Sequence, residues 1–166
     1  YESKSGATAA YARWLSEETG FDAVPVKKAR KLADYDIVVL GSCVRMYKPA
    51  MAKWIERHWS VLSGRKTALF TVAGAAAADP KRAQWVRDAL GPIADQLPHV
   101  PLDGKMKFAD MPWLDRKLMG MAIKMTAKSN PEEAKEMGKE FDRVERANLE
   151  PLRKRLAEWG VALKKA

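Results

Sequence analysis

The chain has 166 residues, of which 47% are apolar and 31% are charged, a balance typical of one ordinary globular domain. Collagen-like, low-complexity and disordered classes are therefore excluded. The 30 lysines and arginines outnumber the 21 acidic residues and give a net charge of +9, which favours anionic partners such as nucleic acid, an acidic lipid or a carboxylate substrate.

Metal and disulfide chemistry is not indicated by the sequence. The single cysteine, Cys43, excludes an internal disulfide and any multi-cysteine metal site. His58 and His99 have no partner at metal-ligand spacing, so no metal is expected. The longest uncharged stretch, Thr67–Ala78, has 12 residues, fewer than the roughly 18–20 that a membrane-spanning helix needs. We therefore expect a cytoplasmic protein without a transmembrane helix.

The predicted elements begin with a helix over Ala7–Thr19, whose start lies only six residues into the chain. We expect a strand before this helix, so the first strand of the sheet is missing from the sequence in hand. The next segment, Asp22–Val26, has the pattern of a short strand, and Pro25 favours a place at the sheet edge.

Two stronger strands follow, each with a helix after it. Asp36–Gly41 and Lys66–Val72 are apolar runs rich in β-branched residues, as expected for strands buried on both faces. Helices are predicted over Pro49–Leu62 and Pro80–Leu90, each opened by a proline, and Val100–Phe108 is the weakest strand. This alternation predicts an α/β fold with a doubly wound parallel sheet and helices on both faces.

From Asp110 onward the pattern contains helices only. A helix over Pro112–Lys128 is followed by a stop at Ser129–Pro131 and by a long helical region that reaches Gly160. One apolar stripe in that region has helical spacing and is predicted to be buried; it consists of Leu149, Leu152, Leu156, Trp159 and Leu163. No linker or repeat is found, so residues 1–166 are predicted to form one domain.

The loop Ser3–Thr8 has the composition of a phosphate-binding turn. Gly6 lets the backbone approach a ligand, and the first amides of the following helix have no intrahelical acceptor. The hydroxyls of Ser3, Ser5 and Thr8 add donors. The Gly-Lys-Ser/Thr ending of a Walker loop and the three-glycine dinucleotide fingerprint are both absent. A monophosphate therefore fits the loop better than a triphosphate, although a serine-capped helix start gives the same pattern.

The pattern Tyr1-x-Ser3-x-x-Gly6-x-Thr8-x-x-x-Ala12-x-x-Leu15 resembles the flavodoxin signature without its first two strand residues. The resemblance implies a flavodoxin-like sheet with strand order 2-1-3-4-5 and an FMN whose phosphate lies in the loop Ser3–Thr8. Ligands of open α/β sheets bind at the point where the strand order reverses, and this rule predicts the same location.

Two further segments are similar to the flavodoxin-like family that includes menaquinone-dependent protoporphyrinogen IX dehydrogenase. They are Gly41–Tyr47, after a strand, and Trp113–Met125, an aromatic-x-Asp-Arg helix. This likeness implies an FMN oxidoreductase that passes electrons from a porphyrinogen to a membrane quinone in haem biosynthesis. It gives no catalytic acid or base. The expected cofactor-binding residues are Ser3, Lys4, Ser5, Gly6, Ala7, Thr8, Ser42, Cys43, Val44, Arg45, Met46, Tyr47, Ala73, Gly74 and Ala75.

Several of these residues also have a structural interpretation. Tyr47 either stacks on the flavin or packs on a neighbour, and Arg45 either contacts a ligand or is a solvated surface arginine. Nothing around Cys43 indicates a thiolate of low pKa, so inert packing is expected. Gly74–Asp79 is either a ligand-binding turn or a helix start.

The helix Trp113–Lys128 combines apolar residues with four cations. Such a helix either packs on the sheet or makes peripheral contact with the inner face of the cell membrane. Two other functions remain as alternatives. An electron carrier of the flavodoxin type, without a small-molecule substrate site, is the second hypothesis. Nucleic-acid binding ranks low because the cations are dispersed and no such motif is found. The sequence does not predict an oligomeric state.

Overall fold

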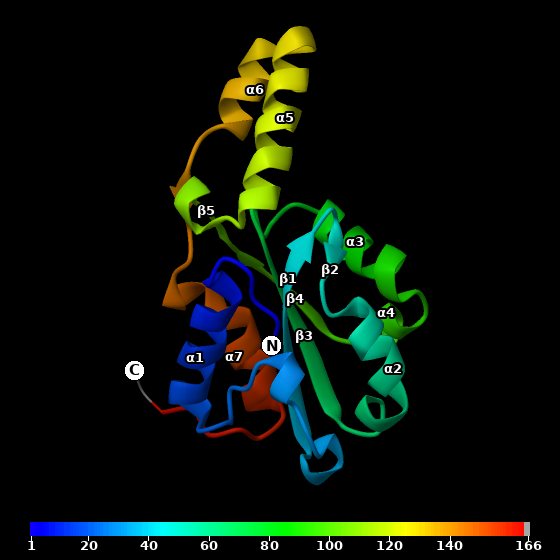
Figure 1. The fold of residues 1–166 in the computed structure, drawn as a ribbon. Helices are drawn as coiled ribbons and strands as arrows, with labels where there is room; N and C mark the ends of the chain where they lie inside the picture. The colour runs from blue at the N-terminus through cyan, green and yellow to red at the C-terminus, as the bar shows by residue number, and fades with distance from the viewer. Residues whose placement is uncertain (165–166) are drawn as a thin grey trace.

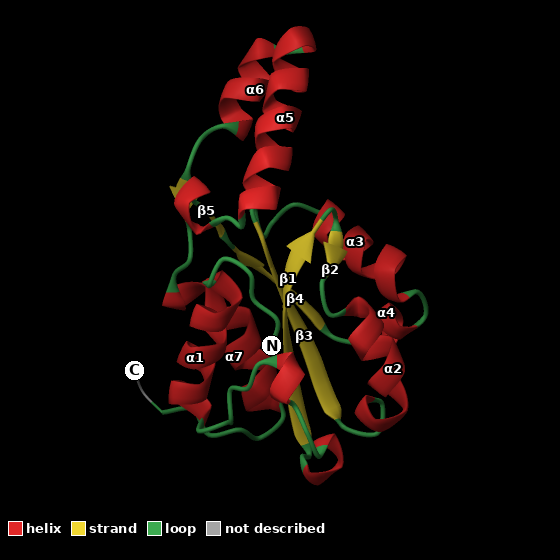
Figure 2. Cartoon of the chain, viewed as in Figure 1, coloured by secondary structure: helices red, strands yellow, loops and turns green. Residues whose placement is uncertain are grey.

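The computed structural model describes residues 1–164, apart from the side chain of residue 133. Its centre is a parallel β-sheet with helices on both faces (Figures 1 and 2). The helices are α1 (Ala7–Thr19), α2 (Ala52–Leu62), α3 (Lys81–Leu90), α4 (Ile93–Gln96), α5 (Trp113–Ser129), α6 (Pro131–Met137) and α7 (Glu150–Glu158). The strands are β1 (Ile37–Arg45), β2 (Lys48–Pro49), β3 (Lys66–Ala73), β4 (His99–Asp103), β5 (Lys105–Met106) and β6 (Phe141–Asp142).

The main sheet has the order β2-β1-β3-β4. β3 is parallel to β1 on one side and to β4 on the other, and β2 is the antiparallel return of a hairpin at the end of β1. The crossovers from β1 to β3 and from β3 to β4 contain helices, as parallel neighbours require. The predicted α/β class with a parallel sheet and helices on both faces is confirmed.

Residues Tyr1 and Glu2 lie beside β1 like the end of a further strand. Glu2 forms a parallel bridge with Ser42, in which its amide donates to Gly41 O over 2.7 Å. On the other side, the amide of Val26 donates to Tyr1 O over 2.7 Å. The first pair of residues therefore lies between residues 24–26 and β1, which is the spatial order that the flavodoxin resemblance implies.

Two strand predictions are wrong, because one segment is not a strand and the other is divided into two strands. Asp22–Val26 is not a strand, because Pro25 has no amide proton and only Tyr1 lies alongside to pair with it. The predicted strand Val100–Phe108 is instead β4 and β5, separated at Gly104. A Cβ at Gly104 would lie 2.5 Å from the carbonyl oxygen of Ala73, so only glycine allows the chain to pass there.

A cavity of about 780 Å³ runs along the edge of β1 that faces away from β3. Its walls are Ile37–Gly41, the α1 residues Ala12 and Leu15, and parts of the segment 20–36. Within the described residues, β2 pairs with this edge only at Val44 and Arg45 and Glu2 bridges to Ser42, so no strand pairs with the stretch Ile37–Leu40 on this side. The cavity is therefore a gap between a strand edge and a helix, and it lies away from the loops expected to bind FMN.

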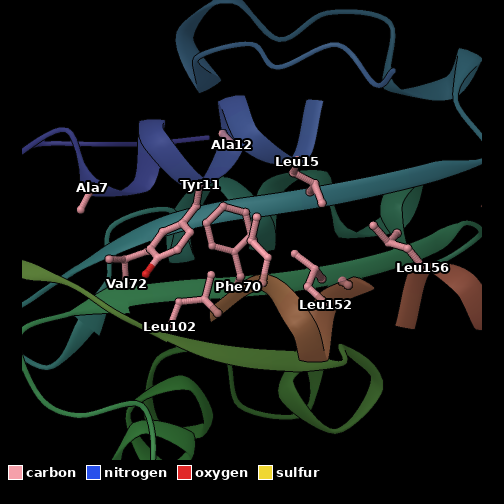
Figure 3. Close-up of a cluster of buried hydrophobic side chains, with 11 residues drawn as sticks. Ala7, Tyr11, Ala12, Leu15, Phe70, Val72, Leu102, Leu152 and Leu156 are labelled. Carbon is pink, nitrogen blue, oxygen red and sulfur yellow. The ribbon is translucent and has the colours of Figure 1, made fainter. Parts of the chain in front are cut away.

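The core has one cluster on each face of the sheet. Tyr11 and Leu15 of α1 pack with Leu152 and Leu156 of α7 against Phe70 (Figure 3). On the other face, Ile55 and Leu62 of α2 and Val86 of α3 cover Leu40 and Leu69. Full burial of each such side chain contributes about 1.5–3 kcal/mol. The two clusters hold the sheet between two layers of helices.

The expectation of helices only after Asp110 is wrong. The predicted helical region to Gly160 is divided into α6 and α7, and between them β6 pairs with β5, Phe141 opposite Met106. Gly138 ends α6, its amide donating to Ala134 O. Pro49 likewise belongs to β2, and α2 begins only at Ala52.

The paired helices α5 and α6 stand away from the rest of the molecule (Figure 1). In contrast to the helices beside the sheet, α5 has no buried residue. Within residues 1–164, no helix combines the length and apolarity that crossing a membrane requires.

Candidate functional site

The loops that follow β1, β3 and β4 meet at the carboxyl edge of the sheet, together with the start of α1. They surround a cavity of about 180 Å³. Nine of the residues predicted to bind the cofactor line this cavity: Lys4, Ser5, Ala7, Thr8, Cys43, Val44, Arg45, Ala73 and Gly74. The tertiary structure thus brings three separate predicted segments to one place.

The turn before α1 has the geometry of an anion site. Gly6 is the N-cap residue with φ of +82°, a conformation that disfavours other residues. The amides of Ala7 and Thr8 have no acceptor among the described residues, and they carry the positive end of the helix dipole. The ammonium of Lys105 lies 4.0 Å from the position that a Cβ on Gly6 would occupy. Unpaired amides and a nearby cation suit a phosphate.

Ser3 serves the helix itself. Its Oγ accepts a hydrogen bond from the amide of Ala9 over 3.2 Å, and Ser3 does not line the cavity. The capping interpretation therefore describes Ser3, while Ser5 and Thr8 lie on the cavity wall.

The end of β1 and the hairpin turn that follows it are divided between the cavity wall and the exterior. Ser42 is buried, with its Oγ accepting from the amide of Met51 over 3.1 Å. Met46 and Tyr47 have φ of 45° and 63° and form the exposed tip of the β1–β2 hairpin. The ring of Tyr47 lies 5.2 Å from that of Trp85, between ring centroids, and does not line the cavity. Tyr47 thus has a packing partner on α3.

Cys43 lies on the cavity wall and is partly buried. Burial and, to a smaller degree, the charge of Glu2 raise the pKa of its thiol. A thiol with a raised pKa stays protonated at neutral pH and is a poor nucleophile. The geometry therefore gives Cys43 the role of a packing residue.

The loop after β3 accepts hydrogen bonds from two arginine side chains. Ala73 and Gly74 line the cavity, whereas the carbonyl of Ala75 accepts a hydrogen bond from Arg82 Nη1 over 2.8 Å. The carbonyl of Gly74 accepts a second one from Arg143. Two arginines thus fix the direction of this loop.

Sequence reasoning missed the wall formed by the segment after β4 and by the base of α5. Gly104, Lys105, Met106 and Lys107 come from the first, and Met111, Pro112, Asp115 and Met119 from the second. The first group lies at this edge because it follows β4, which ends at Asp103, whereas the predicted strand Val100–Phe108 places these residues inside the sheet. No local signal indicates that α5 returns to this edge.

Charges of both signs surround the cavity. Lys105 Nζ lies 2.6 Å from a carboxylate oxygen of Asp110, and Lys107 Nζ lies 2.9 Å from one of Asp142. The Lys105 hydrogen bond lowers the pKa of Asp110. Arg45 forms an ion pair with Asp115 that joins the β1 hairpin to α5. Among the described residues, Lys4 is the cation of the cavity wall that has no carboxylate partner.

The cavity is smaller than a typical cofactor site, which occupies about 300–1,000 Å³. Part of its wall is the base of α5, held by the Arg45–Asp115 ion pair at a half-exposed position. A ligand larger than this cavity would have to displace this wall or extend beyond it.

These features define the class of protein: an open α/β sheet with a turn of anion-site geometry at the carboxyl edge of its strands. Comparison with protein families agrees with this class. The family described as Flavodoxin domain matches residues 1–132, so the chain belongs to that family. The match covers every element from α1 to α5. No curated protein and no solved structure gives a significant match.

Proposed function

We propose that the protein binds FMN at the carboxyl edge of its sheet and transfers electrons. The turn at Gly6 is the observation that carries the proposal, because it combines unpaired helix amides with the ammonium of Lys105. The family match to residues 1–132 supports FMN as the ligand, since flavodoxin domains usually bind this flavin.

The residues present fit such a ligand. The amides of Ala7 and Thr8 and the ammonium of Lys105 would hold the phosphate, while Cys43–Arg45 and Ala73–Gly74 would border the ring. Bound FMN supplies one- and two-electron redox chemistry, and the protein tunes its potential through charge and hydrogen bonds.

A pair of substitutions at Gly6 tests the phosphate site. Gly6→Asp places a carboxylate where the phosphate is expected, and we expect FMN affinity to fall roughly a hundredfold through charge repulsion. The matched control is Gly6→Asn, because asparagine has the shape of aspartate without its charge and adopts the left-handed backbone equally well. This variant should retain most of the affinity for FMN. Titration of FMN followed by flavin fluorescence measures both. Equal affinities of the two variants would contradict the proposal.

The substrate class we propose is a porphyrinogen whose electrons pass to a quinone. Its support is the resemblance of the Gly41–Tyr47 and Trp113–Met125 segments, which meet in the structure through the Arg45–Asp115 ion pair. Lys4, Lys107 and Arg45 at the cavity suit a substrate with carboxylates, and Met106, Met111 and Met119 offer an adaptable apolar wall.

The porphyrinogen proposal is tested with FMN-loaded protein. We expect the rate of protoporphyrin formation, followed by its fluorescence, to depend on both the protein and an added quinone. If FMN binds and is reduced reversibly but no porphyrin forms, the protein is an electron carrier of the flavodoxin type.

A further inference from the structure

One side of helix α5 is partly buried, and the opposite side is exposed to solvent. Four of its half-buried residues follow one another at three- and four-residue spacing along one side of the helix: Asp115, Met119, Ala122 and Thr126. α6 packs beside this helix, where Ile123 lies next to Gly138 and Ala134 is buried. On the opposite side of α5, no residue is buried by any part of the chain that the structure describes.

The solvent-exposed side of α5 carries a continuous apolar stripe. Leu114, Leu118, Met121 and Met125 are separated by four, three and four residues, which places them within about 60° of one another around the helix. Their exposed fractions are 49%, 52%, 52% and 68%. Trp113, at the start of the helix, is 74% exposed. A stripe of this length on a projecting helix is not part of the core.

Lysines border the stripe on one side. Lys117, Lys124 and Lys128 fall within about 40° of one another and next to the apolar residues. Within the described part of the chain, none of the three forms an ion pair with a carboxylate. The lysines of the neighbouring segment are different, since Lys135 pairs with Glu132 and Lys139 pairs with Glu136.

We propose that this face of α5 docks on the surface of a bilayer that contains anionic lipids. The unpaired ammoniums would meet lipid phosphates, while the stripe enters the boundary between headgroups and acyl chains. Charge complementarity favours this partner, because α5 carries four cations and its single acid, Asp115, is neutralised by Arg45. The narrow, straight stripe lies along a helix that projects from the body, so a flat surface can reach it.

Docking in this way has a consequence for the cavity. Asp115 and Met119 belong to the base of the same helix and line the cavity wall. A bilayer on the outer face of α5 would therefore lie next to the candidate site. The docking surface itself does not depend on the identity of the bound cofactor.

Vesicle flotation tests the proposal with the whole chain. Vesicles of phosphatidylglycerol and phosphatidylcholine are compared with vesicles of phosphatidylcholine alone, at low and high salt. We expect binding to the anionic vesicles only, with release as salt screens the charges. Lys124→Glu with Lys128→Glu should weaken binding by about tenfold or more.

Two further double variants make the test specific. Leu118→Ser with Met125→Ser should also weaken vesicle binding, because it removes half of the stripe. The control is Lys53→Glu with Lys154→Glu, which changes the net charge by the same amount as the α5 double variant but at exposed lysines of α2 and α7. We expect this control to bind anionic vesicles as the unchanged protein does. Circular dichroism melting checks that all variants remain folded.

Three results would overturn the proposal. They are absence of binding to anionic vesicles, equal loss of binding in the control variant, and binding that is insensitive to the changes on α5. Sedimentation velocity addresses a second copy as the partner. Association of the unchanged chain that disappears in Leu118→Ser with Met125→Ser, without vesicle binding, would make this face an interface between copies.

Discussion

Arg82 carries its charge inside the protein, with 1% of its surface exposed. Its guanidinium donates to carbonyl oxygens and to a hydroxyl: Nη2 to Thr71 O over 2.8 Å and to Thr71 Oγ1 over 3.1 Å, and Nη1 to Ala75 O over 2.8 Å. Burial lowers the pKa of Arg82. Arg82 is thus a positioning residue for the loop after β3, which borders the candidate site.

His99 lies in the same network, with Nε2 2.8 Å from Thr71 Oγ1. Burial and the charge of Arg82 lower the pKa of His99 from 6.5 to about 4. Because the folded state disfavours the proton, stability is greatest above pH 6.5 and falls as the pH drops towards 4. The free energy of unfolding falls by at most about 3 kcal/mol through this group.

Urea unfolding at pH 7 and pH 5 measures this dependence. We expect His99→Gln to flatten the change between the two pH values, since glutamine keeps a polar atom near Thr71 and does not titrate. A variant with the full pH dependence of the unchanged protein would show that other groups are responsible.

At the scale of elements, a buried ion pair joins α1 to α7. Arg153 Nε and Nη2 donate to the two carboxylate oxygens of Glu18 over 2.8 and 2.7 Å, and Glu18 is 3% exposed. The hydrogen bond from Arg153 is the main cause of the lowered pKa of Glu18. The pair ties the ends of two helices that are far apart in the sequence.

We expect Glu18→Gln to lower the free energy of unfolding by about 3 kcal/mol, because it removes the charge of the buried carboxylate that binds Arg153 and leaves Arg153 only the exposed Glu150, 3.5 Å away, as an ionic partner. Glu17, the next residue, is exposed and pairs with Arg13 and Arg146. Glu17→Gln should therefore cost less than about 1 kcal/mol. Denaturant unfolding of both variants at pH 7 gives the comparison, and equal losses would contradict this account.

The elements also show where local pattern was sufficient. Of the predicted apolar stripe, Leu149, Leu152 and Leu156 are fully buried, whereas Trp159 and Leu163 are only partly buried because α7 ends at Glu158. The interruption before it was not predicted, because Phe141 and Asp142 become a strand only through pairing with Lys105 and Met106. A two-residue strand has too few residues to produce a period in the sequence.

At the scale of the whole molecule, two hollows have different origins. The larger follows the edge of β1 at Ile37–Gly41, where α1 and the segment 20–36 form its other walls. The smaller lies where the loops after β1, β3 and β4 converge. Size therefore does not identify the candidate site, whereas its position at the carboxyl edge of the strands does.

The placement of charge is also a property of the whole molecule. The excess of +9 is read directly from composition, yet composition does not show which cations are paired. Lys105 and Lys107 have carboxylate partners, whereas Lys117, Lys124 and Lys128 have none among the described residues. The structure thus separates the paired lysines beside the candidate site from the lysines of α5, whose charge is not neutralised by a carboxylate.

The sequence by itself determined the fold class, the parallel pairing of its two apolar strands, the helix after Gly6 and the turn before it. These features depend on patterns that neighbouring residues share, such as apolar periodicity and the special backbone of glycine. Only the tertiary structure decided that Lys105 approaches Gly6, that α5 supplies part of the cavity wall, and that Tyr47 packs on Trp85. Such contacts join residues far apart in the chain, and they are fixed by packing across the sheet rather than by any local preference of the backbone.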